Sequence, residues 1–427
     1  MDDRLEGMLE FLDHAHSAYH AAAAIVWELE AAGYTCLAES ESWELEAGGK
    51  YYLTRNGSSV IAFRVPEHTP KGFMMSASHS DRPGFKYKGG GELVDQYTKM
   101  GVEVYGGPVM STWLDRPLSL AGRALVETEN GVETRLVDLD QDLFLIPNVA
   151  IHMNRKVNEG VALNVAVDML PLVGDAADAG KLEQLLEAAA GGKVLGHDLY
   201  VYNRQKSAVW GMEQQYFSAP GIDDGECAWC CAQGFLQARE AESIPVLCVF
   251  DNEEIGSGTR QGAGSRLLED VLDRICQALE LDLYRMLAQS FMVSADNAHA
   301  LHPNHPEASD SKNTPMMNRG VAIKFHAGQK YTTDGISAAV FRKICQDAGV
   351  PVQSYHNKAD SLGGATLGHL LLGHVSVPSV DIGLPQLAMH SSYETAGVED
   401  ALCLMEAMEA YYGASLECPG DGMVIVK

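Results

Sequence analysis

Apolar and polar positions along this chain alternate in two ways, which together predict a sheet covered by helices. Short runs rich in β-branched and aromatic residues, as at 50–55, 58–64 and 244–250, are typical of strands. Apolar residues three and four positions apart over 5–32 and 226–240 are typical of helices. The run 244–250 is apolar throughout, which indicates a strand buried on both faces of a parallel sheet.

Several residues mark where helices begin and end. Gly33 is a plausible C-cap for the first helical segment, and Asp334 is the expected N-cap of a helix that ends near Ala348. A last helix is expected over 399–412. Because helices and strands alternate after Asp223, we expect an α/β domain with helices on both faces of its sheet.

The middle of the chain has a different pattern. From about residue 88, short β-type segments such as 118–126 are separated by glycine-rich or charged turns, and only 176–190 has strong helical spacing. We interpret 88–218, called the insert below, as a β-rich second domain placed within the first. The first domain is then discontinuous, with residues 1–87 and 219–427.

Two adjacent carboxylates, Glu253 and Glu254, follow the buried run 244–250 and precede a glycine-rich turn. Open α/β sheets bind their ligands beyond the carboxyl ends of the strands. Neighbouring residues on an extended chain point in different directions, so one glutamate can face a metal while the other faces the water that the metal activates. A solvated acidic turn is the alternative for this pair taken alone.

Other residues of the metal-binding type occupy similar places. His79, Asp296 and, after a short turn, His390 follow apolar runs, and Asp223 precedes the helical segment 226–240. One histidine in such a place is more often packed or capping, but these four positions together with Glu254 are hard to explain as accidents. With Glu254 they give two imidazoles and three carboxylates, which suit zinc and also cobalt or manganese. One bridging aspartate with two further ligands per ion makes a two-metal site, and Glu253 is left to handle protons.

Composition limits the class of protein. The 427 residues suffice for two domains, 46% are hydrophobic, and the net charge of −27 argues against nucleic acid and anionic membranes as partners. The acidic amino terminus has no signal-peptide pattern, and no apolar run approaches the roughly 20 residues of a membrane span. Nine cysteines fit a reducing compartment, and those at 227–231 are expected to pack in a helix. We therefore expect a cytoplasmic protein.

The chain resembles the aspartyl aminopeptidases of metallopeptidase family 18, which are two-zinc aminopeptidases, over nearly its whole length. The resemblance rests on several long motifs in a fixed order. They are Ser78-His79-Ser80-Asp81, the segments 146–152 and 250–257, the segment 294–304 and Gln386-Leu387-Ala388-Met389-His390-Ser391.

The resemblance implies a zinc-exopeptidase-like fold with a dimerisation domain as the insert, and a tetrahedral dodecamer built from dimers. One zinc would be bound by His79 and Asp296 and the other by Glu254 and His390, with Asp223 bridging the two. Glu253 would be the general base, and Asp81 would accept the second ring proton of His79. His152 would reach the active site of a neighbouring subunit. Candidates for binding the peptide substrate or its oxyanion are His152, Lys324 and Tyr331.

Some alternatives stay open. Asp224 competes with Asp223 as the bridging residue, because this chain has Gly221-Ile222-Asp223-Asp224 where many relatives have Arg-Leu-Asp-Asn. A preference for amino-terminal Asp or Glu needs a cation in the pocket, for which Lys324, Lys330 and Arg82 are the candidates. A related metal-dependent deacylase or amidohydrolase and a non-catalytic assembly protein on the same fold are the alternative functions.

Overall fold

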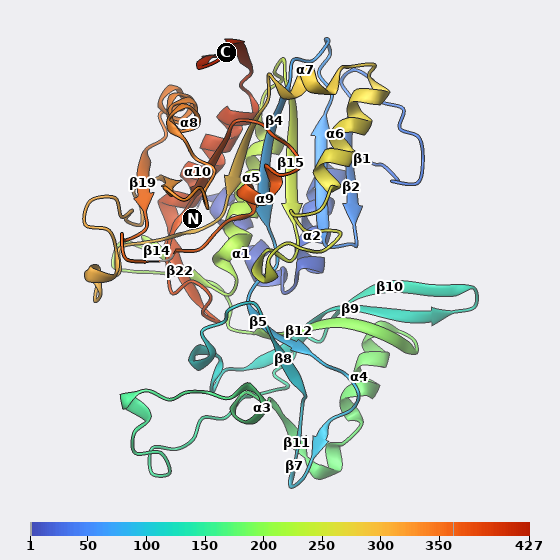
Figure 1. Ribbon diagram of the computed structural model, residues 1–427. Coiled ribbons are helices and arrows are strands. Elements are labelled where there is room, and N and C mark those ends of the chain that lie inside the picture. Colours follow the sequence, from blue (N-terminus) through green and yellow to red (C-terminus); the bar gives the residue numbers. More distant parts are fainter. Residues whose placement is uncertain (1, 362) are drawn as a thin grey trace.

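A computed structural model describes residues 2–361 and 363–427, and its largest element is a nine-stranded sheet (Figure 1). The four central strands β15, β4, β16 and β20 run parallel, so their carboxyl ends lie at one edge. The order across the sheet is β1 (Thr35–Cys36), β2 (Lys50–Arg55), β3 (Ser59–Arg64), β15 (Ile244–Phe250), β4 (Phe73–His79), β16 (Phe291–Ala295), β20 (Ser379–Gly383), β18 (Val321–Phe325) and β19 (Val352–His356).

Helices cover both faces of this sheet, which confirms the predicted mixed α/β fold. Alternate residues of each central strand enter different cores: Leu247 and Val249 pack in one, and Val246 and Cys248 in the other. This arrangement explains why the run is apolar throughout. One face carries α1 (Asp3–His14), α2 (Ala18–Ala31), α5 (Ile222–Gln237), α8 (Gly335–Ala348) and α10 (Val398–Tyr412), and the other carries α6 (Leu267–Ala278), α7 (Leu283–Leu287) and α9 (Leu367–Leu371).

The first helical segment is two helices rather than one. Its predicted range 5–32 breaks between α1 and α2, where the side chain of Ser17 caps α2 by accepting a hydrogen bond from the backbone N–H of His20. Spacing of apolar residues could not show the break, because both helices bury their apolar faces in the same core. The C-cap of α2 is Ala32, and the expected Gly33 follows it with a φ of +83°, so the glycine ends the helix one residue beyond its cap. The expected N-cap Asp334 is confirmed for α8.

The insert forms an antiparallel sheet at the end of the molecule toward which β4 and β15 point (Figure 1). Its core is separate from the two cores of the main sheet. The strand order is β10 (Gly131–Asp138), β9 (Leu118–Thr128), β12 (Val194–Asn203), β5 (Gly84–Tyr87) and β8 (Val102–Tyr105). The chain thus enters this sheet with β5, shortly after β4 and before the predicted insert boundary at residue 88.

Smaller elements complete the insert. A three-stranded sheet lies beside the main insert sheet, and the expected helix at 176–190 is a short 3₁₀ turn followed, after Gly180, by α4. The elements are β6 (Leu93–Val94), β7 (Tyr97–Lys99), β11 (Leu172–Asp175), α3 (Val165–Asp168), α4 (Lys181–Ala190), η1 (Met110–Trp113), η2 (Val157–Glu159) and η3 (Ala176–Asp178).

A second five-stranded sheet joins segments that are far apart in the sequence. It brings the end of the insert beside the turn that carries His390. Its order is β13 (Ala208–Trp210), β14 (Tyr216–Ala219), β22 (Glu394–Gly397), β21 (Pro385–Leu387) and β17 (Ala298–His299); the remaining elements are η4 (Glu253–Ile255), η5 (Pro306–Ala308) and the hairpin of β23 (Leu416–Gly420) and β24 (Met423–Val426).

The described part of the chain contains no helix with the length and apolar character that crossing a lipid bilayer requires. All nine cysteines are free, and Cys227, Cys230 and Cys231 are buried in α5 as packed helix thiols.

Candidate active site

Five metal-type side chains come together at the carboxyl edge of the main sheet. His79 is the last residue of β4, Glu254 lies in η4 directly after β15, and Asp296 follows β16. Because β15, β4 and β16 are neighbouring parallel strands, the three residues meet at one edge. Asp223, at the start of α5, and His390, in the turn after β21, approach from the helix side and the second sheet.

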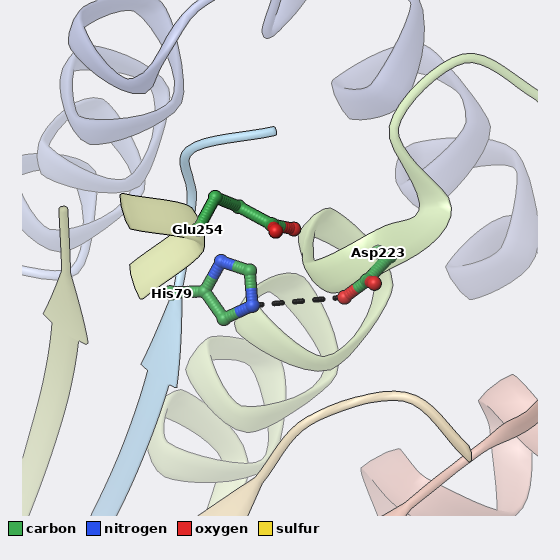
Figure 2. Close-up of side chains that lie close together, drawn as sticks. All are labelled: His79, Asp223 and Glu254. Carbon is green, nitrogen blue, oxygen red and sulfur yellow. Dashed lines mark ion pairs between the residues drawn. The ribbon is translucent and has the colours of Figure 1, made fainter. Parts of the chain in front are cut away.

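Distances between side-chain atoms place Asp223 at the centre of this group. Its Oδ1 lies 3.6 Å from His79 Nε2, and its Oδ2 lies 3.4 Å from His390 Nε2, which is also 3.4 Å from Glu254 Oε1. Figure 2 shows His79, Asp223 and Glu254 pointing toward one another. In each of two groups, one ligand atom per residue lies within 4.8 Å of the others: His79, Asp223 and Glu254 in one, and Asp223, Asp224 and Asp296 in the other.

The electrostatics of the edge fit a bound cation. Burial raises the pKa values of Glu254 and Asp296, and the charge of Asp223 raises both further. The pKa of Asp223 itself is lowered, because its hydrogen bond to His390 and the charge of His79 outweigh its burial. Oδ1 of Asp223 and Oδ1 of Asp224 are buried without a hydrogen-bond partner among the described residues. Buried carboxylates of this kind need a cation or a proton, and these nitrogen and oxygen donors suit zinc.

Glu253 lies beside the ligand-type groups without belonging to either group of three. Its side chain lines the cavity above the edge, and burial raises its pKa to about 7. The ordinary value is 4.5, so burial alone makes this carboxylate a stronger proton acceptor. A cation bound nearby would act in the opposite direction by favouring the charged form.

Asp81 connects His79 to the two glutamates. Its backbone carbonyl is 3.2 Å, and its carboxylate Oδ1 3.4 Å, from Nδ1 of His79, as expected of a group that fixes the imidazole. The same carboxylate accepts hydrogen bonds from the backbone N–H groups of Glu253 at 3.0 Å and Glu254 at 3.1 Å. Asp81 therefore holds both His79 and the turn that contains Glu253 and Glu254.

Glu394 is a supporting residue that we did not predict from the sequence. Its two carboxylate oxygens accept hydrogen bonds from the backbone N–H groups of His390, at 2.8 Å, and Asp223, at 3.1 Å. It is buried, and burial with the charge of Asp223 raises its pKa to about 8. It thus joins two of the ligand-type segments. Its only signal in the sequence is a glutamate four residues after His390.

A cavity of about 290 Å³ opens beside the site and has walls of both catalytic-type and aromatic residues. Lys324 and Tyr331 line it, as predicted for substrate-binding candidates, but the ammonium of Lys324 is already engaged. It donates to the carbonyls of Asp296 at 2.7 Å and Asn297 at 3.0 Å, and lies 3.3 Å from Oδ1 of Asp296. Burial opposes its charge, but Asp296 raises the pKa of Lys324 above its ordinary value.

The other predicted cations and His152 lie outside this cavity wall. Arg82 donates to the carbonyl of Ala15 at 2.5 Å, and its guanidinium lies where a side chain at Gly221 would be. Lys330 and His152 are also absent from the residues that line the cavity. His152 is exposed in the segment between β10 and α3, so the structure of one chain does not bring it to the metal-type residues.

Fold and site together define a mixed α/β protein with an imidazole and carboxylate cluster at the carboxyl edge of its sheet. The family model described as "Aminopeptidase I zinc metalloprotease (M18)" matches residues 11–412. The chain therefore belongs to the M18 family of zinc metalloproteases, and it is an aminopeptidase-type hydrolase.

Individual relatives agree with this assignment. A protein of Clostridium novyi (strain NT) called "Probable M18 family aminopeptidase 2" is 41% identical, covering 95% of this chain and 97% of the relative. One of the same name from Pseudomonas paraeruginosa is 38% identical, covering 96% and 98%. A chain from "Cryo-EM structure of the Ape4 and Nbr1 complex" is 32% identical with a TM-score of 0.93, covering 96% of this chain and 85% of that chain. A chain from "Crystal structure of prApe1" is 26% identical with a TM-score of 0.91, covering 96% of this chain and 94% of that chain.

Proposed function

We propose that this chain removes amino-terminal residues from peptides with two zinc ions held at the carboxyl edge of the main sheet. By resemblance, His79 and Asp296 would hold one ion, Glu254 and His390 the other, and Asp223 both; the groups of close ligand atoms share Asp223 but pair His79 with Glu254 and Asp296 with Asp224. The observation that carries the proposal is the central place of Asp223, which belongs to both groups of close ligand atoms. Its buried Oδ1, without a partner among the described residues, is consistent with this role. Cobalt or manganese would suit the same donors.

Glu253 is the proposed general base. Bound zinc supplies Lewis acidity, which lowers the pKa of water and polarises the peptide carbonyl. Glu253 takes a proton from the attacking water and returns it to the leaving amine. Asp81 supports this step because it accepts a hydrogen bond from the backbone N–H of Glu253. This bond fixes the backbone from which the Glu253 side chain extends. A base with a pKa near the working pH is the most effective one.

The proposed site favours a substrate with a free amino terminus. Asp223, Glu253, Glu254 and Asp296 all line the cavity, and an ion held by these carboxylates would bind the free α-amino group of a peptide. A volume of about 290 Å³ leaves room for about one side chain beside the reacting peptide bond. Tyr331, whose ring lies 5.2 Å from the Lys324 ammonium, is a candidate for contact with that side chain or with the oxyanion.

A preference for amino-terminal Asp or Glu is the finer part of the proposal. It rests on the resemblance to aspartyl aminopeptidases and on Lys324, whose charge lies in the cavity wall. Because the ammonium of Lys324 already donates to two carbonyls, it would attract a substrate carboxylate through its field more than through a new hydrogen bond.

The insert is proposed to be a dimerisation domain, and the assembly a tetrahedral dodecamer of cytoplasmic chains. Exposed apolar side chains near His152, namely Val149, Ile151 and Met153, support an interface at this place. In such an assembly His152 would reach the site of a neighbouring subunit and bind substrate there.

A panel of dipeptides that differ only in the amino-terminal residue tests this function, with added zinc, cobalt or manganese. We expect Asp and Glu to be released faster than Lys or Arg, and N-acetylated versions to resist cleavage. Faster release of Lys than Asp would remove the acidic preference and leave the aminopeptidase. Cleavage of the acetylated peptides at equal rates would favour a deacylase or amidohydrolase. No turnover with full metal occupancy would favour a non-catalytic assembly protein.

A further inference from the structure

Three consecutive residues of the insert contact the candidate active site of their own chain. They begin with Tyr105, the last residue of β8, which pairs with Gly84 at the start of β5. Gly84 comes three positions after Asp81, so the register of this sheet brings Tyr105 behind the metal-type residues. Figure 1 shows β5 and β8 beside each other below the main sheet.

Tyr105 makes the central contact. Its hydroxyl donates to Oδ2 of Asp81 at 2.7 Å and accepts a hydrogen bond from Nδ2 of Asn252 at 2.8 Å. Both Asp81 and Tyr105 are buried, with 4% and 7% of their surfaces exposed. Burial and the nearby carboxylate of Asp81 raise the pKa of the Tyr105 phenol, so the hydroxyl stays protonated and remains a donor.

The next two residues complete the contact. Gly106 has a φ of +68°, and a Cβ at this position would lie 3.1 Å from Cβ of Glu254. The carbonyl of Gly107 is 3.0 Å from Nδ1 of His390, and the N–H of Val109 donates to the carbonyl of His390 at 2.9 Å. A carbonyl beside Nδ1 favours a proton at that nitrogen, so a neutral His390 would present an unprotonated Nε2, the nitrogen that faces Asp223 and Glu254, to a metal ion.

We propose that Tyr105 is a positioning residue of the active site, so that the insert sets the geometry of Glu253, Glu254 and His79 within its own chain through Asp81. This role rests on the proposed function and differs from the proposed contribution of His152 to a neighbouring subunit. Asp81 can hold His79 and the two backbone N–H groups in one arrangement only while its own carboxylate is fixed. Tyr105 donates to Oδ2 of this carboxylate, the oxygen opposite the His79 contact at Oδ1, and so fixes it.

Tyr105→Phe removes the hydroxyl and keeps the ring. Groups that hold metal-binding residues in place typically contribute 10–100-fold to activity or metal affinity. We expect kcat to fall about 10-fold, with KM changed by less than about 2-fold, because Tyr105 is not among the residues that line the cavity. With cobalt in the protein, we expect a changed visible absorption spectrum or a weaker cobalt affinity, because His79 and Glu254 lose their fixed positions.

Tyr87→Phe is the matched control. Tyr87 lies on β5 in the same sheet, is 2% exposed, and has a buried hydroxyl with no hydrogen-bond partner in the described ranges. Loss of its hydroxyl removes the same single oxygen from the same sheet, and we expect wild-type kcat and an unchanged cobalt spectrum. Replacement of Tyr105 by 4-aminophenylalanine keeps a donor at the same place and is expected to restore kcat to within about 3-fold of wild type.

The activities and cobalt spectra of all variants are compared below the lowest of their unfolding temperatures. A loss of stability is then measured by the unfolding temperature and does not lower the measured activity. If Tyr105→Phe matches Tyr87→Phe in kcat and in the cobalt spectrum, the positioning role is overturned. If the 4-aminophenylalanine variant folds yet stays as slow as Tyr105→Phe, the hydrogen bond is not the cause. A wild-type protein that binds cobalt but cleaves no peptide would overturn the proposed function, while the cobalt spectra would still test Tyr105.

Discussion

Two regions contain residues with predicted roles in catalysis: the carboxyl edge of the main sheet and the segment of the insert around His152. The residues at the edge are buried, whereas the segment around His152 is exposed. At the edge, His79 and Asp223 are 1% and 3% exposed, and each is held by bonds within its own chain. Around His152, by contrast, Ile151 and Met153 are 49% and 83% exposed. Buried charged groups need partners in place, whereas an exposed imidazole is solvated by water, and exposed apolar groups around it favour an interface at that place.

The comparison teaches that the two regions should respond differently to mutation. A substitution at the edge damages only the site of the chain that carries it. A substitution at His152 should damage the site of a neighbouring subunit and should therefore be repaired in mixed assemblies. Tyr105 and Gly107 differ from His152. They also belong to the insert by sequence, but they contact the edge of the main sheet in their own chain.

Glu253→Gln is expected to give the largest loss of rate. Glutamine has nearly the same shape but cannot accept the proton from water, and loss of a general base typically costs about 10²–10⁴ in rate. Metal content by mass spectrometry should equal that of the wild type, because Glu253 belongs to neither group of close ligand atoms. Activity within about 3-fold of wild type would remove Glu253 from this role.

Asp223→Asn is expected to lower occupancy at both metal positions, whereas Glu254→Ala should mainly empty one. Only Asp223 lies in both groups of ligand atoms, and a neutral amide compensates less of the charge of two cations. Metal stoichiometry after dialysis against a weak chelator measures the difference. Asp224→Asn is the control, since Asp224 lies in one group only. If this control empties both positions and Asp223→Asn does not, Asp224 is the bridging residue.

His152→Ala is expected to have the smallest effect of the three, with normal assembly and metal content and about a 10-fold loss of turnover. When His152→Ala and Glu253→Gln are dissociated, mixed and reassembled, the mixture should be more active than the same amounts of the two variants kept apart. Some sites would then combine an intact Glu253 with an intact His152 from a neighbouring chain. Absence of recovery in oligomers verified as mixed would mean that His152 acts within its own chain or has no role in turnover.

Local sequence patterns determined much of the fold and of the candidate site. The apolar run 244–250 predicted a buried strand, because a strand with helices on both faces buries every residue. Residues at the carboxyl ends of parallel strands must meet, so the places of His79, Glu254 and Asp296 followed from the same pattern. The break between α1 and α2 did not, because both helices pack on one core and the apolar spacing continues across Ser17.

Only the tertiary structure decided how the site is supported. Glu394, which holds His390, contacts Asp223 across 171 positions of sequence, and Gly107 contacts His390 across 283 positions. Such contacts leave no periodic signal, and Gly107 acts through its backbone carbonyl, which every residue type possesses. The charge of Lys324 could be read from the sequence, but its engagement by two backbone carbonyls could not. Sequence periodicity records which way each side chain faces locally, whereas the partner it meets depends on how distant segments pack.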